Sequence, residues 1–163
     1  MMMAGIGLDA QVISDLRPAL KTRFGKAAYL IEVIRTLRRW PLAQVQIHMG
    51  DLDLRSGTVI VSRGKRYGGS FILAPEADLA GSTLHVTCFP SGPSLSVFAR
   101  FLMIPLGLLR PFGLVDQGAV QSLDIPGPAG DPVQADGDVV THLPAHISLS
   151  EQSIPFCVPT DWA

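Results

Sequence analysis

From Ala43 onward the sequence alternates between apolar and polar residues, which is the pattern of strands with one buried face. Val45, Ile47 and Met49 fall on one side of the first such strand, and polar residues fall on the other. Further short strands are predicted at 57–64, 70–75 and 82–89, and then in AVQSLDI, DPVQAD, GDVV, HISLS and SIPFCV. Strands that follow one another without regular helical crossovers favour antiparallel pairing. We therefore predict a mainly β fold, a two-layer antiparallel β-sandwich with one or two flanking helices.

Two segments have helical rather than strand periodicity. Residues 24–39 place apolar side chains at i, i+3, i+4 and i+7, and Pro41 prevents the helix from continuing. A second helix is predicted from residue 94 and is expected to bend or end near Pro105. We expect the 24–39 helix to pack outside the sandwich, and residues 4–16 to form a short strand or loop that runs into a helical turn.

The charge of the chain is unevenly distributed, although the net charge is only −1. All thirteen Lys and Arg lie in residues 1–110, whereas residues 111–163 hold seven acidic residues and no cation. The basic residues of the first half suit phosphates, anionic lipid headgroups or a solvated helix face: Arg17, Lys21, Arg23, Lys26, Arg35, Arg38 and Arg39. Interleaved aromatic residues and a strong net positive charge are both missing, so we expect no nucleic-acid partner.

Cysteine, histidine and hydropathy patterns exclude several classes of protein. Cys88 and Cys157 form neither a disulfide framework nor a zinc spacing, and they are predicted to be buried thiols in a reducing, cytoplasmic compartment. The most apolar run, residues 95–109, contains Arg100 and Pro105 and is too short to span a membrane. The start of the chain lacks the features of a signal peptide. The four histidines predict no metal site, and no glycine-rich nucleotide loop is present.

Four short motifs remain. They are GIGLDA at residues 5–10, YGGS at 67–70, APEA at 74–77 and the Asp-Gly-Asp of VQADGD at 136–138. An Asp-Gly pair between apolar runs is a strong hairpin signal, so the last motif on its own predicts either a bare turn or a site that presents two carboxylates.

In this order the four motifs resemble the C-terminal half of the diacylglycerol kinase catalytic-domain superfamily, which includes bacterial lipid kinases and sphingosine kinases. The resemblance covers about residues 4–159, nearly the whole chain. It implies an enzyme that transfers the γ-phosphoryl group of ATP to a lipid hydroxyl, with an α/β nucleotide-binding domain followed by a β-rich domain. Residues 1–163 match the second domain only. We expect a single domain that is inactive alone, with the N-terminal nucleotide-binding domain absent and with ATP and magnesium bound only in the complete enzyme.

The resemblance also implies roles for individual residues. Asp138 matches the acid that accepts the hydroxyl proton, although it is one methylene shorter than the usual glutamate. Asp136 matches the first acid of the motif, which either holds the hairpin or assists the site. Tyr67, Gly68 and Gly69 are expected to line the substrate cleft. Gly81 stands where the family often has an aspartate that helps to bind a structural magnesium, so no metal site is predicted in this chain.

Two functions from different classes remain open. The chain is either the C-terminal domain of a lipid kinase, active with a nucleotide-binding domain supplied in trans, or a non-catalytic β-sandwich module that binds lipid or a protein partner. The expected partners are a lipid substrate or membrane surface, the missing nucleotide-binding domain, or a second copy of the chain through an exposed face. The expected location is the cytoplasm, with peripheral membrane association.

Overall fold

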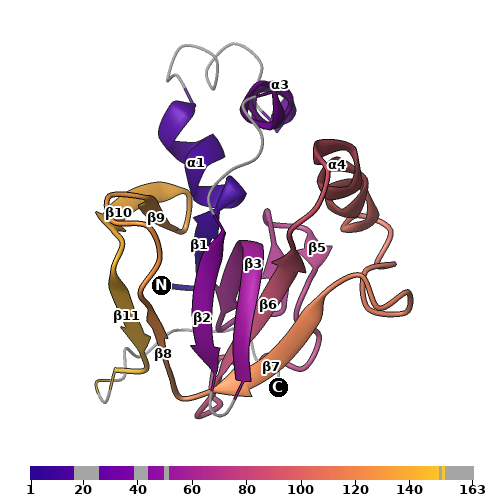
Figure 1. Cartoon of the computed structure of the whole chain (residues 1–163). Helices are drawn as coiled ribbons and strands as arrows, with labels where there is room; N and C mark the ends of the chain where they lie inside the picture. Colours follow the sequence, from indigo (N-terminus) through magenta and orange to yellow (C-terminus); the bar gives the residue numbers. More distant parts are fainter. Residues whose placement is uncertain (17–25, 39–43, 50–51, 151, 153–163) are drawn as a thin grey trace.

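The computed structural model describes residues 1–16, 26–38, 44–49, 52–150 and 152. Its helices are α1 (Leu8–Asp15), α3 (Lys26–Leu37) and α4 (Ser94–Met103). Its strands are β1 (Met3–Gly7), β2 (Val45–Met49), β3 (Leu52–Ser62), β4 (Arg66–Tyr67), β5 (Phe71–Ile72), β6 (Leu84–Pro90), β7 (Asp116–Val120), β8 (Ser122–Ile125), β9 (Pro132–Ala135), β10 (Asp138–His142) and β11 (Ala145–Ser148). The β4–β5 pair forms a small sheet of its own, and the other strands form one large sheet (Figure 1).

The large sheet folds into two layers around the long strand β3. The second half of β3 pairs with β1 and β6, and its first half pairs with β2. Strand β7 pairs with β6, whereas the next strand, β8, pairs with β2 and β11, so the chain crosses from one layer to the other between them. Every one of these ladders is antiparallel. The predicted antiparallel β-sandwich is confirmed.

The main core lies between the two layers. Alternate residues of each strand point into it, as the period-2 pattern requires, and Val45 and Ile47 are fully buried as predicted. Cys88 is also buried here, in agreement with the sequence analysis. The buried members of this core are Ala4, Ile6, Val45, Ile47, Val59, Val61, Leu84, Val86, Cys88, Leu123, Ile125, Val133, Leu143 and Ile147.

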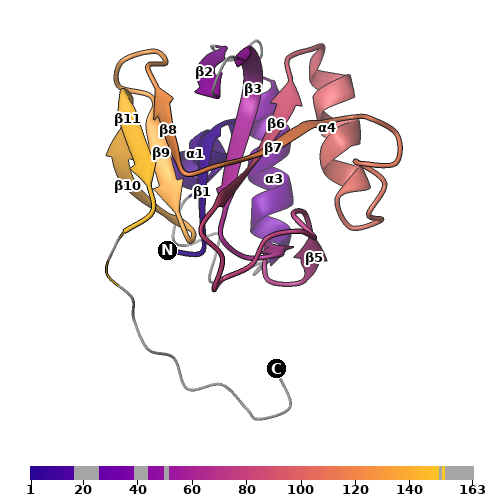
Figure 2. The ribbon, with the colours of Figure 1, turned by 90° about the horizontal axis from the view of Figure 1, so that it is seen from below.

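The helices cover the outer face of the layer that contains β1, β3 and β6. A small cluster joins them through Leu8 and Val12 of α1, Leu37 of α3 and Val97 of α4. Phe101 of α4 also stacks on Phe89 of β6, with ring centroids 5.2 Å apart. In Figure 2, α4 and the β8–β11 pair lie at opposite sides of the molecule. The predicted helix at 24–39 is therefore present as α3 and packs outside the sandwich, and α4 ends two residues before Pro105.

Three details differ from the predictions. The sequence of residues 51–57, DLDLRSG, indicates a hairpin crossing, but from residue 52 onward this segment belongs to β3, because a bulge between Ser56 and Thr58 lets the strand continue past Gly57. The strand expected at 70–75 is only the two-residue β5, because its backbone turns at once into a loop. The strand expected at 153–158, with Cys157, lies outside the described residues.

Candidate functional site

The GIGLDA motif forms the junction between β1 and α1. Gly7 has a φ of 79°, and a Cβ there would lie 2.3 Å from the carbonyl oxygen of Gly57, so only glycine fits. The first helical N–H, from Leu8, donates to the hydroxyl oxygen of Thr58 at 3.2 Å and so finds a partner outside the helix. This junction places Asp9 in the first turn of α1 and points its side chain back across β1.

Asp9 is a buried carboxylate, with only 8% of its surface exposed. Its Oδ1 accepts a hydrogen bond from the Tyr67 hydroxyl at 2.5 Å, and its Oδ2 accepts one from Nε2 of Gln134 at 2.6 Å. A Cβ on Gly5 would lie 1.8 Å from Asp9 Oδ2, so the missing side chain of Gly5 provides the space for this carboxylate. The position of the aspartate therefore explains Gly5, and the backbone turn that leads to the aspartate explains Gly7.

Gln134 continues the path to the Asp-Gly-Asp turn. Its Oε1 accepts a hydrogen bond from the backbone N–H of Gly137 at 3.0 Å. Because that N–H can only donate, the amide of Gln134 is oriented with its oxygen toward Gly137 and its NH₂ group toward Asp9. An unbroken path of hydrogen bonds, from Tyr67 through Asp9 and Gln134 to Gly137, joins three of the four sequence motifs.

Burial affects the protonation of two groups in this path, Asp9 and Tyr67. Burial raises the pKa of Asp9 above its ordinary value, although the hydrogen bonds from Tyr67 and Gln134 act in the opposite direction. Burial also raises the pKa of Tyr67 well above its ordinary value, and the neighbouring Asp9 charge and their hydrogen bond add to this effect. Tyr67 therefore keeps its proton and remains a donor to Asp9.

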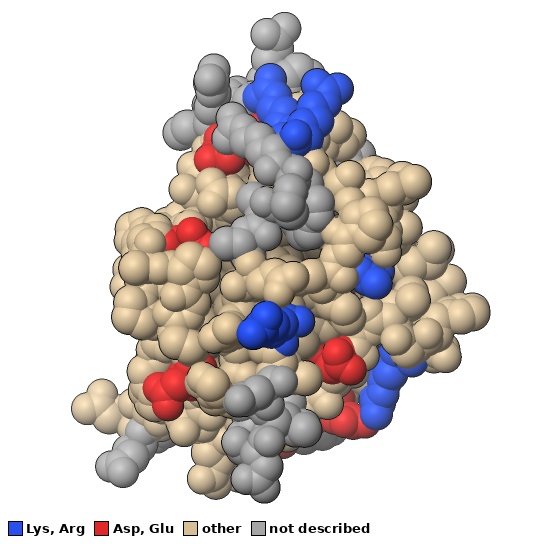
Figure 3. All heavy atoms as spheres, in the orientation of Figure 1, with Lys and Arg blue, Asp and Glu red and all other residues tan. Residues whose placement is uncertain are grey.

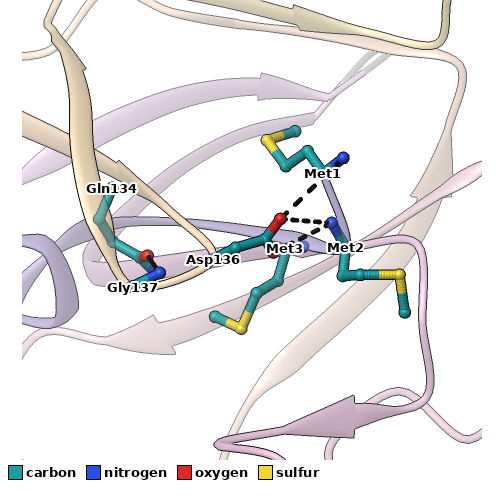
Figure 4. A network of polar contacts seen from close by, with 6 residues as sticks. All are labelled: Met1, Met2, Met3, Gln134, Asp136 and Gly137. Carbon is teal, nitrogen blue, oxygen red and sulfur yellow. Dashed lines mark hydrogen bonds and ion pairs between the residues drawn. The ribbon is translucent and has the colours of Figure 1, made fainter.

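Asp136 anchors the β9–β10 turn to the start of the chain. Its backbone has a φ of 50°, which aspartate tolerates better than most residues. Its carboxylate accepts hydrogen bonds from the backbone N–H groups of Met2 and Met3, at 3.0 and 2.9 Å (Figure 4). These contacts support the hairpin-holding role, and the catalytic role of Asp136 stays a prediction.

Asp138 and the glycines of the YGGS motif are exposed. Asp138 is the first residue of β10 and lies opposite Ala135 in the hairpin. Gly68 and Gly69 form the tip of the β4–β5 hairpin, with φ values of 57° and 85°. The structure thus links the turn that carries Asp138 to Tyr67 through hydrogen bonds, while the roles of Asp138, Gly68 and Gly69 stay predictions.

A comparison with models of protein families shows to which family this chain belongs. Residues 2–158 match the model of the YegS C-terminal NAD kinase beta sandwich-like domain. The chain belongs to this family. A comparison with curated proteins gave no match.

Solved structures agree with this YegS C-terminal assignment at the level of the fold. One neighbour, titled a "putative diacylglycerol kinase" from Bacillus anthracis str. Sterne, has a TM-score of 0.64 and 24% sequence identity, over 89% of this chain and 48% of its own. A second, titled a diacylglycerol kinase from the same strain, has a TM-score of 0.61 and 23% identity, over 90% of this chain and 48% of its own. The chain therefore spans about half the length of these neighbours.

The turn at residues 78–81 does not fit a magnesium ion in this member of the YegS C-terminal family. Gly81 has no side-chain oxygen, and its N–H donates to the carbonyl of Asp78 at 3.0 Å. Oδ1 of Asp78 accepts from the N–H of Ala80, also at 3.0 Å, so the single carboxylate of the turn caps its own backbone. Across the described ranges, no group of three or more His, Cys, Asp or Glu side chains is placed to hold a metal ion.

Sequence reasoning missed the centre of the site. The motifs GIGLDA and VQADGD contain Asp9 and Gln134, but the sequence pattern predicts no role for either side chain. The Gly-x-Gly spacing before Asp9 was the available signal for a closely approached carboxylate. Gln134 had a weaker signal, since a polar residue between Val133 and Ala135 lies on the face of β9 opposite the core side chain of Val133.

Proposed function

We propose that this chain is the C-terminal domain of an ATP-dependent lipid kinase, which transfers the γ-phosphoryl group of ATP to a lipid hydroxyl when a nucleotide-binding half is present. The observation that carries the proposal is the hydrogen-bond path from Tyr67 through Asp9 and Gln134 to Gly137. A bare turn at 136–138 does not need this connection. A site that must hold its general base in register with a neighbouring loop does need it.

Asp138 is the proposed general base. Its exposed carboxylate accepts the proton of the lipid hydroxyl, the hydroxyl oxygen bonds to the γ-phosphorus, and ADP leaves with the electrons of the broken P–O bond. Asp9 is unsuited to this step, because it is buried and both of its oxygens already accept hydrogen bonds. We assign Asp9, Tyr67 and Gln134 a positioning role behind the turn.

The nucleotide and its magnesium are assigned to the other half of the enzyme. Phosphoryl transfer depends on a metal ion and on groups that cradle the phosphates. The single carboxylate of the turn at 78–81 accepts a hydrogen bond from its own backbone, and the sequence has no glycine-rich phosphate loop; both observations support this assignment. This chain then supplies the base and part of the lipid-binding surface.

Reconstitution tests the proposal. The purified chain is incubated with ATP, magnesium and a panel of lipids that carry a free hydroxyl, first alone and then fused to the N-terminal half of a full-length relative. We expect no labelled lipid from the chain alone and labelled lipid from the fusion. The matched control is the same N-terminal half joined to its own C-terminal half. If that control is active and the fusion phosphorylates no lipid, the chain is a non-catalytic module instead.

A further inference from the structure

Two turns of the chain project side by side from the outer, helix-bearing face. One is the β4–β5 hairpin, and the other is the connection from α4 to β7, residues 104–115. Tyr67 of the hairpin packs in the same apolar cluster as Ile104 and Leu109 of the connection. Arg110 of the connection also forms a 2.6 Å ion pair with Glu76, which follows the hairpin. Figures 1 and 2 both show β5 close to this connection.

Large apolar side chains are exposed on these turns. The exposed fractions are 56% for Ile72, 63% for Leu106 and 68% for Phe112. Gly107 follows Leu106, and Gly113 follows Phe112. Both glycines have positive φ, and a Cβ on either would meet no atom within 4 Å. Leu106 and Phe112 are therefore carried on tight turns that project into open space, rather than on a flat apolar face.

Cations accompany these apolar tips. Lys65 and Arg66 are exposed at the base of the hairpin. Residues 54–75 and 79–115 contain no Asp or Glu at all. The nearby Glu76 is paired with Arg110. In Figure 3 the surface over α4 and the connection that follows it is largely uncharged. Asp78, the one other acid between residues 54 and 115, accepts a hydrogen bond within its own turn. The two turns thus combine protruding apolar tips with exposed cations.

From this combination we propose that these five residues form a membrane-docking surface for an anionic lipid bilayer: Lys65, Arg66, Ile72, Leu106 and Phe112. The apolar tips enter the boundary between headgroups and acyl chains, and the cations contact anionic headgroups. Separate convex tips suit a fluid bilayer better than a rigid protein partner, since a stable protein interface needs a continuous, complementary patch. The inference goes beyond the proposed function, because it depends on neither Asp138 nor phosphoryl transfer.

Vesicle co-sedimentation of the full chain tests the proposal. The probes are vesicles of phosphatidylcholine alone and vesicles of phosphatidylcholine mixed with phosphatidylglycerol. We expect binding to the mixed vesicles, and a loss of about 25-fold in the variant Lys65→Gln/Arg66→Gln, at about fivefold for each cation. The variant Leu106→Ser/Phe112→Ser should lose at least about tenfold. Circular dichroism confirms that each variant is folded.

Two matched controls separate this surface from other exposed groups. Leu95 is 76% exposed but lies in the first turn of α4, about 12 Å along the helix from the C-terminal end, where the connection to β7 begins. Leu95→Ser should therefore bind vesicles as the wild type does. Arg35 in the last turn of α3 and Arg38 directly after the helix are also exposed cations, and Arg35→Gln/Arg38→Gln should change binding by less than about twofold.

Several outcomes would overturn the proposal. One is the absence of binding to the mixed vesicles. Another is a control variant that loses as much vesicle binding as the variant it is matched to. The third is self-association of the chain that Leu106→Ser/Phe112→Ser abolishes. The last result would make a second copy the occupant of this surface. Failure of phosphoryl transfer would leave the vesicle result unchanged, so the two proposals fail separately.

Discussion

Replacing Gln134 with leucine tests whether the buried path works as the geometry indicates. Leucine has nearly the same volume but cannot donate to Asp9 or accept from Gly137. A hydrogen bond to a charged group is worth about 2 kcal/mol, and leaving the Gly137 N–H without a partner costs about 1 kcal/mol more. We therefore expect Gln134→Leu to lower the free energy of unfolding by about 3 kcal/mol at about pH 8.

The cost should depend on pH, because Gln134 stabilises the ionised form of Asp9. Burial already raises the pKa of Asp9, and losing this donor raises it further. A carboxyl with a raised folded-state pKa contributes stability that is fully present below its unfolded pKa of about 4 and lost as pH rises through the folded pKa. The gap between Gln134→Leu and the wild type should therefore widen from about 1 kcal/mol near pH 4 to about 3 kcal/mol near pH 8.

Urea unfolding followed by circular dichroism at both pH values measures this gap. The matched control is Gln117→Leu, because Nε2 of Gln117 donates only to neutral oxygens, of Leu73 and Thr87, both at 3.0 Å. Because Gln117 is exposed whereas Gln134 is buried, its cost should be only about 0.5–1 kcal/mol, and it should be equal at the two pH values. The reasoning is refuted if Gln134→Leu costs no more than Gln117→Leu, or if its cost does not grow with pH.

Two further predictions concern single sites. Gly5→Ala should cost about 2–4 kcal/mol in urea unfolding, because its Cβ would lie 1.8 Å from the Asp9 carboxylate. Gly92→Ala should stay within about 0.5 kcal/mol of the wild type, since its Cβ would meet no atom closer than 3.7 Å, and equal costs for the two variants would contradict the close approach. The Cys88 thiol should resist iodoacetamide in the native chain at about pH 8 and react in urea, as followed by peptide mass spectrometry. Burial, with a smaller contribution from Asp116, raises its pKa to about 12, so modification of native Cys88 would contradict its inert environment.

The strand pattern of the fold could be predicted from the sequence, but the path of the backbone between strands could not. Alternation identified the buried face of β2 because Val45 and Ile47 sit in a regular pleat. The bulge after Ser56 depends on partners from elsewhere: the Ser56 hydroxyl donates to the carbonyls of Thr58 and Phe89, and the latter lies on another strand. Periodicity within one segment carries no information about such long-range contacts.

The sequence predicted which motifs belong to the candidate site, but it did not predict how their side chains contact one another. The resemblance pointed to the turn at 136–138 and to Tyr67, but it did not show what connects them. The connection depends on Asp9 and Gln134, which are 125 residues apart in sequence and meet only because β1 pairs with β9. Asp136 had two possible roles, and its hydrogen bonds to Met2 and Met3 support the structural one.

The most direct test of the central claim is the activity of Asp138 variants in an assembled enzyme. The chain is fused to the N-terminal half of a full-length relative, and transfer of labelled phosphate to lipid is measured for the wild type, Asp138→Asn and Asp138→Glu. A general base contributes about 10²- to 10⁴-fold, so Asp138→Asn should lose activity by that factor while its urea unfolding is unchanged. Asp138→Glu should keep or raise the activity, because it restores the longer carboxylate. A loss of less than about tenfold in Asp138→Asn would contradict the account and leave residues 136–138 as a turn alone.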